Sequence, residues 1–295
     1  MHGPAAALPS ALLEALACPA CHVTPEVVTA GLRCPACGQD YPIRGRVADL
    51  RLPEATSKAE HGDWIEHWSN GKQQLFSQRF FSLYRKAVFA RTVAYFIQHY
   101  FPARGLFVEA GSGTSETSCR IDKRRGERVL VATDIVAEVL QGCDPAMDAR
   151  VAADVFHLPF LDGSIDGIWN VGVMEHFPHD QIDSMLQEFR RVLRPGAPLL
   201  LLWPATDSLP QKGLRMVEAV INARRQGERF RFHPDEISKL RSSEEGRSVM
   251  RRNGFEPVTV DAGLRSLMAF KTVVGRKPLG SPAAQLQLAT TKVDR

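Results

Sequence analysis

One short segment limits what this chain can fold into more than any other. Residues 107–114 read Phe-Val-Glu-Ala-Gly-Ser-Gly-Thr, the pattern of a buried strand that ends on a carboxylate and turns through two glycines. Glycine lets the backbone N–H groups of such a turn approach a ligand, because no Cβ stands in the way. Residues 115–125 then suit a helix. The segment predicts the first strand, turn and helix of an open α/β fold.

Three further segments follow in register, and each combines a short apolar strand or strand end with an acid or amide. They are Val-Leu-Val-Ala-Thr-Asp at 129–134, Ala-Ala-Asp at 152–154 and Ile-Asp-Gly-Ile-Trp-Asn at 165–170. In open α/β sheets, ligands bind outside the carboxyl ends of the strands. We therefore expect these polar side chains to surround one ligand at that edge of the sheet.

These residues, together with Phe-Arg-Arg-Val-Leu-Arg-Pro-Gly at 189–196, resemble the class I methyltransferases that use S-adenosylmethionine (SAM). The resemblance covers roughly residues 105–275. It implies a Rossmann-like α/β fold, with a seven-stranded sheet and helices on both faces. One position departs from the family, because its third loop glycine falls at Ser115. Serine caps helix N-termini well, so we expect the site to survive this change.

The resemblance also implies which residues contact the methyl donor, and all of them lie at strand ends or in the loops that follow. The methionine portion is assigned to Glu109, Gly111, Gly113 and Asn170. The ribose hydroxyls are assigned to Asp134, and the adenine to the Asp154 carboxylate and the Val155 backbone N–H.

A nicotinamide dinucleotide site is the main alternative for the glycine turn. Asp134 lies about 20 residues beyond the glycines, as that fingerprint requires. The fingerprint also needs a glycine where this chain has Glu116. A carboxylate that opens the helix would repel a pyrophosphate. SAM carries no phosphate, so the sequence favours the methyl donor over the dinucleotide.

His176 is the predicted general base. It lies in Glu-His-Phe-Pro-His at 175–179, directly after the strand that carries Asn170. Transfer of an activated methyl group depends mainly on the geometry of donor and acceptor, and a base helps only where the nucleophile must lose a proton. The alternative is that His176 only orients the helix that follows.

Two Cys-x-x-Cys pairs stand near the N-terminus, at Cys18 and Cys21 and at Cys34 and Cys37. Two such turns can direct four sulfurs at one point, which suits closed, tetrahedral structural zinc. Two disulfides or a redox pair are the alternatives, and a reducing cytoplasm argues against them.

This segment also resembles a family. The cysteine pairs and Tyr-Pro-Ile-Arg-Gly-Arg-Val-Ala-Asp-Leu at 41–50 are similar to the small zinc-ribbon proteins that bind and activate methyltransferases. A zinc ribbon also precedes the catalytic domain of some ribosomal RNA methyltransferases, so an RNA acceptor stays open as a second hypothesis. The ribbon itself carries few basic residues, namely Arg33, Arg44 and Arg46.

The predicted organisation has four parts. Residues 1–50 form the zinc ribbon, 51–104 a linker and helical lid, 105–277 the methyltransferase domain and 278–295 a mobile tail. Within the domain, residues 204–246 are expected to form an insertion that shapes the acceptor pocket.

The gross properties of the chain fit this organisation. A net charge of +4 over 295 residues does not by itself indicate binding to nucleic acid. The sequence contains no run of 18 or more apolar residues, so we expect no membrane span. We expect a cytoplasmic enzyme that transfers a methyl group from SAM to a small molecule, lipid or glycan precursor, with peripheral membrane contact allowed. A ribosomal or transfer RNA methyltransferase is the alternative, and a decayed, non-enzymatic scaffold is disfavoured by the intact acids.

Overall fold

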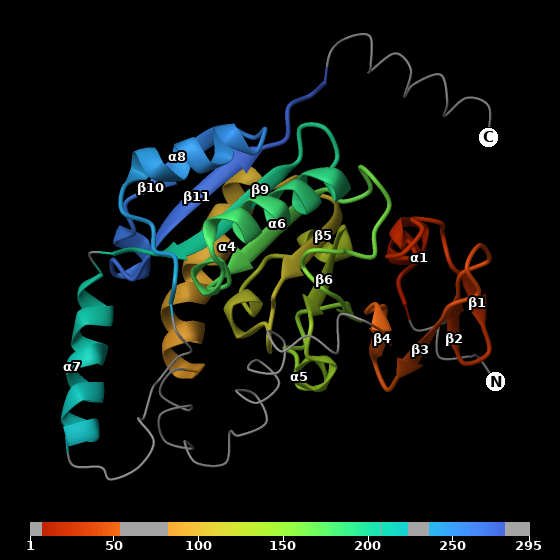
Figure 1. Ribbon diagram of the computed structural model, residues 1–295, viewed down its shortest axis with the longest axis horizontal. Helices are drawn as coiled ribbons and strands as arrows, with labels where there is room; N and C mark the ends of the chain where they lie inside the picture. The colour runs from red at the N-terminus through yellow and green to blue at the C-terminus, as the bar shows by residue number, and fades with distance from the viewer. Residues whose placement is uncertain (1–7, 54–81, 207, 224–235, 281–295) are drawn as a thin grey trace.

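The computed structural model describes residues 8–53, 82–206, 208–223 and 236–280, and its centre is one mixed β-sheet (Figure 1). The described residues contribute eleven strands in the order β1-β2-β3-β4-β7-β6-β5-β8-β9-β11-β10. Their bounds are β1 Glu26–Val28, β2 Gly31–Arg33, β3 Asp40–Arg44, β4 Val47–Asp49, β5 Gly105–Ala110, β6 Arg128–Asp134, β7 Ala149–Ala152, β8 Gly167–Val171, β9 Pro198–Pro204, β10 Glu256–Asp261 and β11 Phe270–Arg276.

The central strands confirm the strand positions that the sequence predicts. β7, β6, β5, β8 and β9 run parallel, and β11 then pairs antiparallel with β9 and with β10. Every residue of β9 is buried, as expected for a strand with helices over both faces. The parallel strands bring their carboxyl ends to one edge of the sheet, which is the edge where ligands bind in this architecture.

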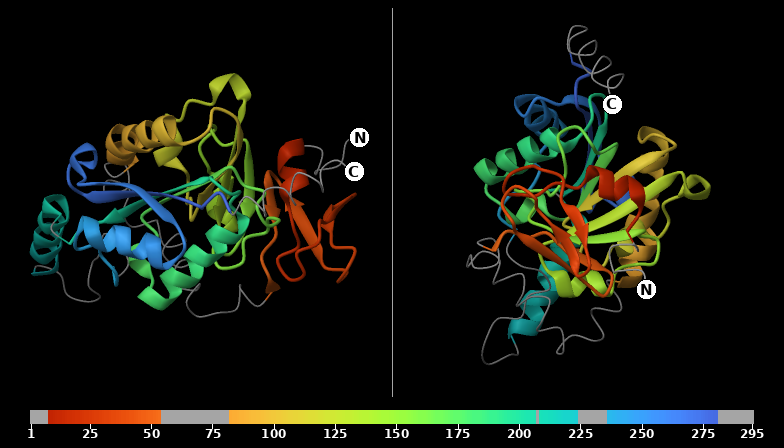
Figure 2. Two further views of the ribbon diagram at one scale, coloured as in Figure 1. Left: turned by 90° about the horizontal axis from the view of Figure 1, so that it is seen from above. Right: turned by 90° about the vertical axis from the view of Figure 1, so that its right-hand side faces the viewer.

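Helices cover both faces of this sheet (Figure 2). On one face lie α4, Ala90–Tyr100, and α5, Ala137–Gln141, whose side chains share a core with the β6 residue Leu130. On the other face lie α6, His179–Val192, and α8, Ser243–Arg252. α6 has apolar residues at helical spacing, and the four residues Ile182, Met185, Leu186 and Phe189 are fully buried.

The expected count of seven strands is not what the structure shows. Seven strands, β5 to β11, come from residues 105–276, and the other four come from residues 26–49. β4 pairs in parallel with β7, with Ala48 opposite Val151, so the N-terminal segment continues the central sheet. Short α1, Ser10–Ala15, contributes Leu12 to the core shared with α6, and Leu16, directly after the helix, joins the same core.

The predicted helix over 115–125 was wrong. Only two 3₁₀ turns form, at Glu116–Ser118 and Arg124–Gly126. Ser115 lies in the left-handed region at φ 54° and its side chain makes no capping bond, so it does not act as the predicted N-cap. The hydroxyls of Thr117 and Ser118 instead donate to the Glu109 carboxylate, an interaction that competes with helix formation.

Three predicted regions are only partly described. Of the 51–104 region, a π-helical turn, Arg85–Phe89, leads into α4, and residues 54–81 lie outside the described part. Of the 204–246 insertion, α7, Leu209–Ala223, extends from the body next to β9, and residues 207 and 224–235 lie outside (Figure 1). The predicted tail is described only at 278–280. Among all the residues that the structure describes, no helix is long and apolar enough to cross a membrane.

Candidate functional site

The carboxyl ends of β5, β6 and β8 bring most of the predicted donor-binding residues together. Glu109 pairs across the sheet with Ala132 of β6 and with Trp169 of β8. Asn170 therefore lies beside the end of β5, and Asp134 ends β6 next to it. The Ala153 N–H donates to the Asp134 carbonyl at 2.9 Å, which brings Asp154 close to the same edge.

Asp134 fixes the glycine turn to the sheet. One carboxylate oxygen accepts the Gly113 N–H at 2.8 Å, and the other accepts the Val136 N–H at 2.9 Å. Burial raises the pKa of Asp134, and these backbone hydrogen bonds oppose the rise. A carboxylate has about four lone-pair sites, so each oxygen can still accept a bond from a ligand hydroxyl.

Glu109 lies beneath the turn and is 1 % exposed. Its oxygens accept the Thr117 hydroxyl at 3.1 Å and the Ser118 hydroxyl at 2.8 Å. Burial raises the pKa of Glu109 to about 7, even though these hydroxyls favour the ionised form. Glu109 therefore supports the loop from below, which agrees with its expected place under the methionine end.

Asp154 and Val155 occupy the tight turn after β7. The Asp154 carboxylate accepts the Phe156 N–H at 3.0 Å and lies 3.4 Å from Nδ1 of His157. The carboxylate is nearly buried and shapes its own turn. Val155 follows directly, so its backbone lies in the segment expected to face the adenine.

Asn170 presents an unsatisfied oxygen at the centre of this edge. The side chain is fully buried, and its Nδ2 donates to the Ala110 carbonyl at 3.4 Å. Among the described residues, its Oδ1 has no hydrogen-bond partner. A buried acceptor without a donor is costly. It fits the amine rather than the carboxylate of a methionine group.

Gly111 brings the turn against the end of β8. Its φ is +66°, and a Cβ built there would lie 2.5 Å from Cγ2 of Val173. Glycine adopts this conformation at little cost, and its missing Cβ leaves room for the Val173 side chain. The turn therefore packs closely against the residues that follow Asn170, and its contact with a ligand stays a prediction.

His176 lies in the 3₁₀ turn Met174–His176 after β8, and its side chain is 10 % exposed. Its Nε2 is 3.7 Å from Oε1 of Glu175. The structure thus places the predicted base next to the donor edge, between β8 and α6. This position agrees with either role expected for His176, proton transfer or orientation of α6.

Glu175 is the residue that the sequence analysis passed over. It is 4 % exposed, and its Oε2 has no hydrogen-bond partner within the described ranges. Burial and, to a smaller extent, the charge of Glu236 raise its pKa to about 8, while a backbone hydrogen bond and the charge of Lys239 oppose the rise. An acid directly after a buried strand was the available signal, but the neighbouring histidine has the more familiar chemistry.

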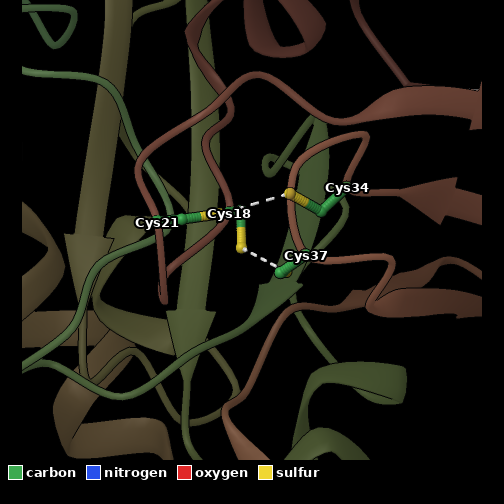
Figure 3. A group of neighbouring side chains, drawn as sticks. All are labelled: Cys18, Cys21, Cys34 and Cys37. Atoms are coloured by element: carbon green, nitrogen blue, oxygen red, sulfur yellow. Dashed lines mark hydrogen bonds between the residues drawn. The ribbon is translucent and has the colours of Figure 1, made fainter.

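The four cysteines form a second site in the N-terminal segment (Figure 3). Their sulfur atoms all lie within 4.8 Å of one another, with Cys18 and Cys37 at 3.7 Å and Cys21 and Cys34 at 3.3 Å. Four thiolates around zinc at 2.3 Å would stand about 3.8 Å apart. The arrangement therefore fits a tetrahedral metal, and all four thiols are free of disulfides.

Comparison with known proteins relates the strands that form this edge to a known family. Residues 108–201 match the family described as "Methyltransferase domain". The chain carries a methyltransferase domain. The matched residues run from β5 through β9 and include the glycine turn, Asp134, Asp154, Asn170 and Glu175.

Individual relatives of the methyltransferase domain are distant. The ubiquinone/menaquinone biosynthesis C-methyltransferase of Cupriavidus pinatubonensis is 26 % identical over 159 residues, which cover 47 % of this chain and 65 % of that protein. The malonyl-[acyl-carrier protein] O-methyltransferase of Dechloromonas aromatica is 33 % identical over 101 residues, which cover 34 % and 37 %. The chain thus spans less than two thirds of the length of either relative.

A solved SAM-dependent methyltransferase from Thermotoga maritima is also similar in fold. It is 16 % identical, with a TM-score of 0.49 over 74 % of this chain and 99 % of that one.

Proposed function

We propose that this protein transfers a methyl group from SAM to a small molecule, lipid or glycan precursor. The observation that carries the proposal is the convergence of the glycine turn, Asp134 and Asn170 at one sheet edge, inside the segment that matches the methyltransferase family. The activity and the acceptor class are both inferences from this edge.

The residues at the edge fit each part of the donor. The unpartnered Asn170 Oδ1 offers an acceptor to the methionine ammonium. Asp134 offers its remaining lone pairs to the ribose hydroxyls, and Asp154 with the Val155 N–H suits the adenine. Gly111 and Gly113 allow the backbone to pass close to the methionine portion. Glu109 holds the turn in place from below.

SAM supplies an activated methyl group on a sulfonium centre, so the protein contributes chiefly alignment and exclusion of water. The buried edge, with Asn170 and Glu175 both below 5 % exposure, provides a water-poor environment. The surface for the acceptor then falls to the segment beside the end of β8, where the Ile237 and Ser238 N–H groups donate to the Glu175 carbonyl.

RNA is the weaker acceptor hypothesis. The ribbon residue Arg33 is paired with Asp40 through two hydrogen bonds, at 2.6 and 2.9 Å, so its charge is already compensated. Sequence-independent RNA binding needs basic side chains free to contact phosphates. The two pairs of cysteines are better explained as structural zinc, and their reduced state fits the cytoplasm that we propose.

Incubation with methyl-labelled SAM tests this function. The protein is mixed with cell extract that has been separated into lipid, small-molecule and RNA fractions, with the Asp134→Ala variant as the control. We expect label in the lipid or small-molecule fraction with the wild type only. Label in RNA would replace the acceptor class, and tighter binding of NAD than of SAM in calorimetry would reject the donor.

A further inference from the structure

We propose that Glu175, rather than His176, accepts the proton from a hydroxyl group of the methyl acceptor. This inference rests on the proposed methyl transfer and names the group that would serve it. It also narrows the acceptor to a molecule with a hydroxyl group on an apolar body.

The Glu175 carboxyl is buried, and hydrogen bonds satisfy it only in part. It is 4 % exposed, and its Oε2 has no hydrogen-bond partner within the ranges that the structure describes. Its Oε1 lies 3.7 Å from the His176 ring nitrogen, which is too long for a hydrogen bond, and the carboxyl also has a hydrogen bond with the Glu175 backbone, which lowers its pKa. Native proteins rarely bury a polar oxygen in this way unless a ligand or a function accounts for it.

The Glu175 carboxyl also lies beside the turn that is expected to bind the donor. A Cβ built on Gly172 would lie 3.3 Å from Oε1 of Glu175, so the carboxyl packs against the backbone directly after β8. The next residue, Val173, packs against Gly111 of the donor turn. Glu175 therefore lies two positions along the chain from Val173, the residue that contacts the loop expected to hold the methionine portion.

Aromatic rings form an apolar wall near the same carboxyl, on the side where we expect the acceptor. The same Gly172 position lies 3.9 Å from the ring of Phe270. Phe270 packs edge to face on Phe89 at 4.8 Å between ring centres, and Phe89 packs on Tyr84 at 5.0 Å. Phe270 comes from β11, Phe89 from the π-helical turn before α4, and Tyr84 directly precedes that turn. An apolar wall next to one proton-accepting group suits a hydroxyl on a ring or lipid, and it disfavours a charged acceptor.

The chemical step balances with this single group. The acceptor oxygen forms a bond to the donor methyl carbon while the carbon–sulfur bond breaks and its electron pair stays on sulfur. The hydroxyl proton passes to a Glu175 oxygen, and the carboxylate becomes a neutral carboxyl. Because burial favours this neutral form, the site stabilises the product of proton transfer.

The pKa of Glu175 suits a proton acceptor. Burial raises its pKa to about 8, and an efficient base has a pKa near the working pH. The charged groups that act on it are Glu236, which raises the pKa, and Lys239, which lowers it. These two form an ion pair with each other, and both lie in the segment that packs over Glu175. His176 then takes no part in the proton transfer.

The test compares Glu175→Gln with His176→Gln in methyl transfer from labelled SAM to the extract fraction that the wild type labels. We expect Glu175→Gln to lower the transfer rate by roughly 10²–10⁴-fold, while its Kd for SAM stays within about twofold. Glu175→Asp should keep part of the rate. An unchanged Kd and melting temperature show that each variant folds.

The pH dependence separates a proton acceptor from a purely structural residue. The wild-type rate should rise with pH through a midpoint near 8, and Glu175→Gln should lose this midpoint. Glu236→Gln should move the midpoint down, and Lys239→Gln should move it up, because each removes one neighbouring charge.

The experiment distinguishes failure of this inference from failure of the proposed function. Full rate and an unchanged midpoint in Glu175→Gln would overturn this inference and leave the methyl transfer intact. Loss of the midpoint in His176→Gln with its retention in Glu175→Gln would assign the proton to the histidine. A wild type that binds no SAM and labels no fraction would reject the proposed function itself.

Discussion

The guanidinium of Arg51 donates a hydrogen bond of 3.0 Å to the backbone carbonyl of Ile135, the residue that directly follows Asp134. Arg51 is itself held by two hydrogen bonds to the carboxylate of Asp49, at 2.8 and 2.7 Å. Asp49 ends β4, so the cysteine-bearing segment reaches the edge where the donor ribose is expected. The two parts of the chain share this edge.

Replacing Arg51 should therefore weaken binding of the donor without a direct contact to it. Arg51→Ala removes the bond to the end of β6, and one such bond is worth about 1 kcal/mol. We expect the Kd for SAM, measured by calorimetry, to rise several-fold. Arg51→Lys should recover little, because lysine cannot make the paired contact with Asp49. An unchanged Kd in both variants would show that the contact does not position Asp134.

The four cysteines should hold one zinc ion per chain. Metal analysis of protein purified without added zinc checks the stoichiometry. Cys34→Ser should lower the melting temperature by several degrees or more, because metal binding and folding are coupled. The matched control is Cys119→Ser, which removes a thiol outside the cluster and should leave the zinc content unchanged. Protein without metal that keeps its full melting temperature would contradict the assignment.

Asp134→Ala should weaken SAM binding by roughly 2–4 kcal/mol, the scale of charge-assisted hydrogen bonds to two hydroxyls. The structure adds a second effect, since the Gly113 and Val136 N–H groups lose their acceptor. We expect unfolding in urea to show a loss of about 1–3 kcal/mol as well. Asp134→Asn is the informative comparison, because an amide can still accept one of these bonds. Affinity for SAM that survives both substitutions would reject the role of Asp134.

Stability should fall as the pH rises from about 4.5 to about 8. The pKa values of Glu109 and Glu175 are raised to about 7 and about 8, from 4.5 for an ordinary glutamate. Between these values the folded protein binds more protons than the unfolded chain, so rising pH favours unfolding. Each group contributes at most about 1.4 kcal/mol per pH unit.

Urea unfolding at about pH 5 and about pH 8.5 measures this dependence. Glu175→Gln should reduce the difference in stability between the two pH values, because the amide does not titrate. Glu244→Gln, an exposed acid of α8, is the control and should leave the difference almost unchanged. Equal pH dependence in wild type and Glu175→Gln would show that Glu175 is not held neutral.

The central sheet and the donor edge were predictable because local signals agree with the tertiary structure there. β5, β6, β8 and β9 are short apolar runs, and the glycines of the turn adopt the positive φ that requires them. The polar residue at each strand end could be placed because parallel strands share a carboxyl edge. The grouping of the cysteines followed from spacing alone, and the structure brings their sulfurs together.

The errors arose where a long-range contact overrides local preference. The helix expected over 115–125 is lost because Thr117 and Ser118 bond to Glu109, a partner eight or nine residues away. The pairing of β4 with β7 joins residues about 100 positions apart, and no local pattern encodes it. Glu175 was missed because its importance comes from burial and an unpartnered oxygen, which a sequence does not show.

The parallel pairing of β4 with β7 has a consequence for aggregation. Without the N-terminal segment, β7 would stand at the margin of the sheet with the backbone groups of Arg150 to Ala152 unpaired. Such a bare margin is a template on which another chain can add a strand. Residues 26–49 continue the sheet through four strands, and β1 at its far end is only three residues long. The cysteine-bearing segment thus also works as a protective cap, and a shortened chain that begins after it should self-associate.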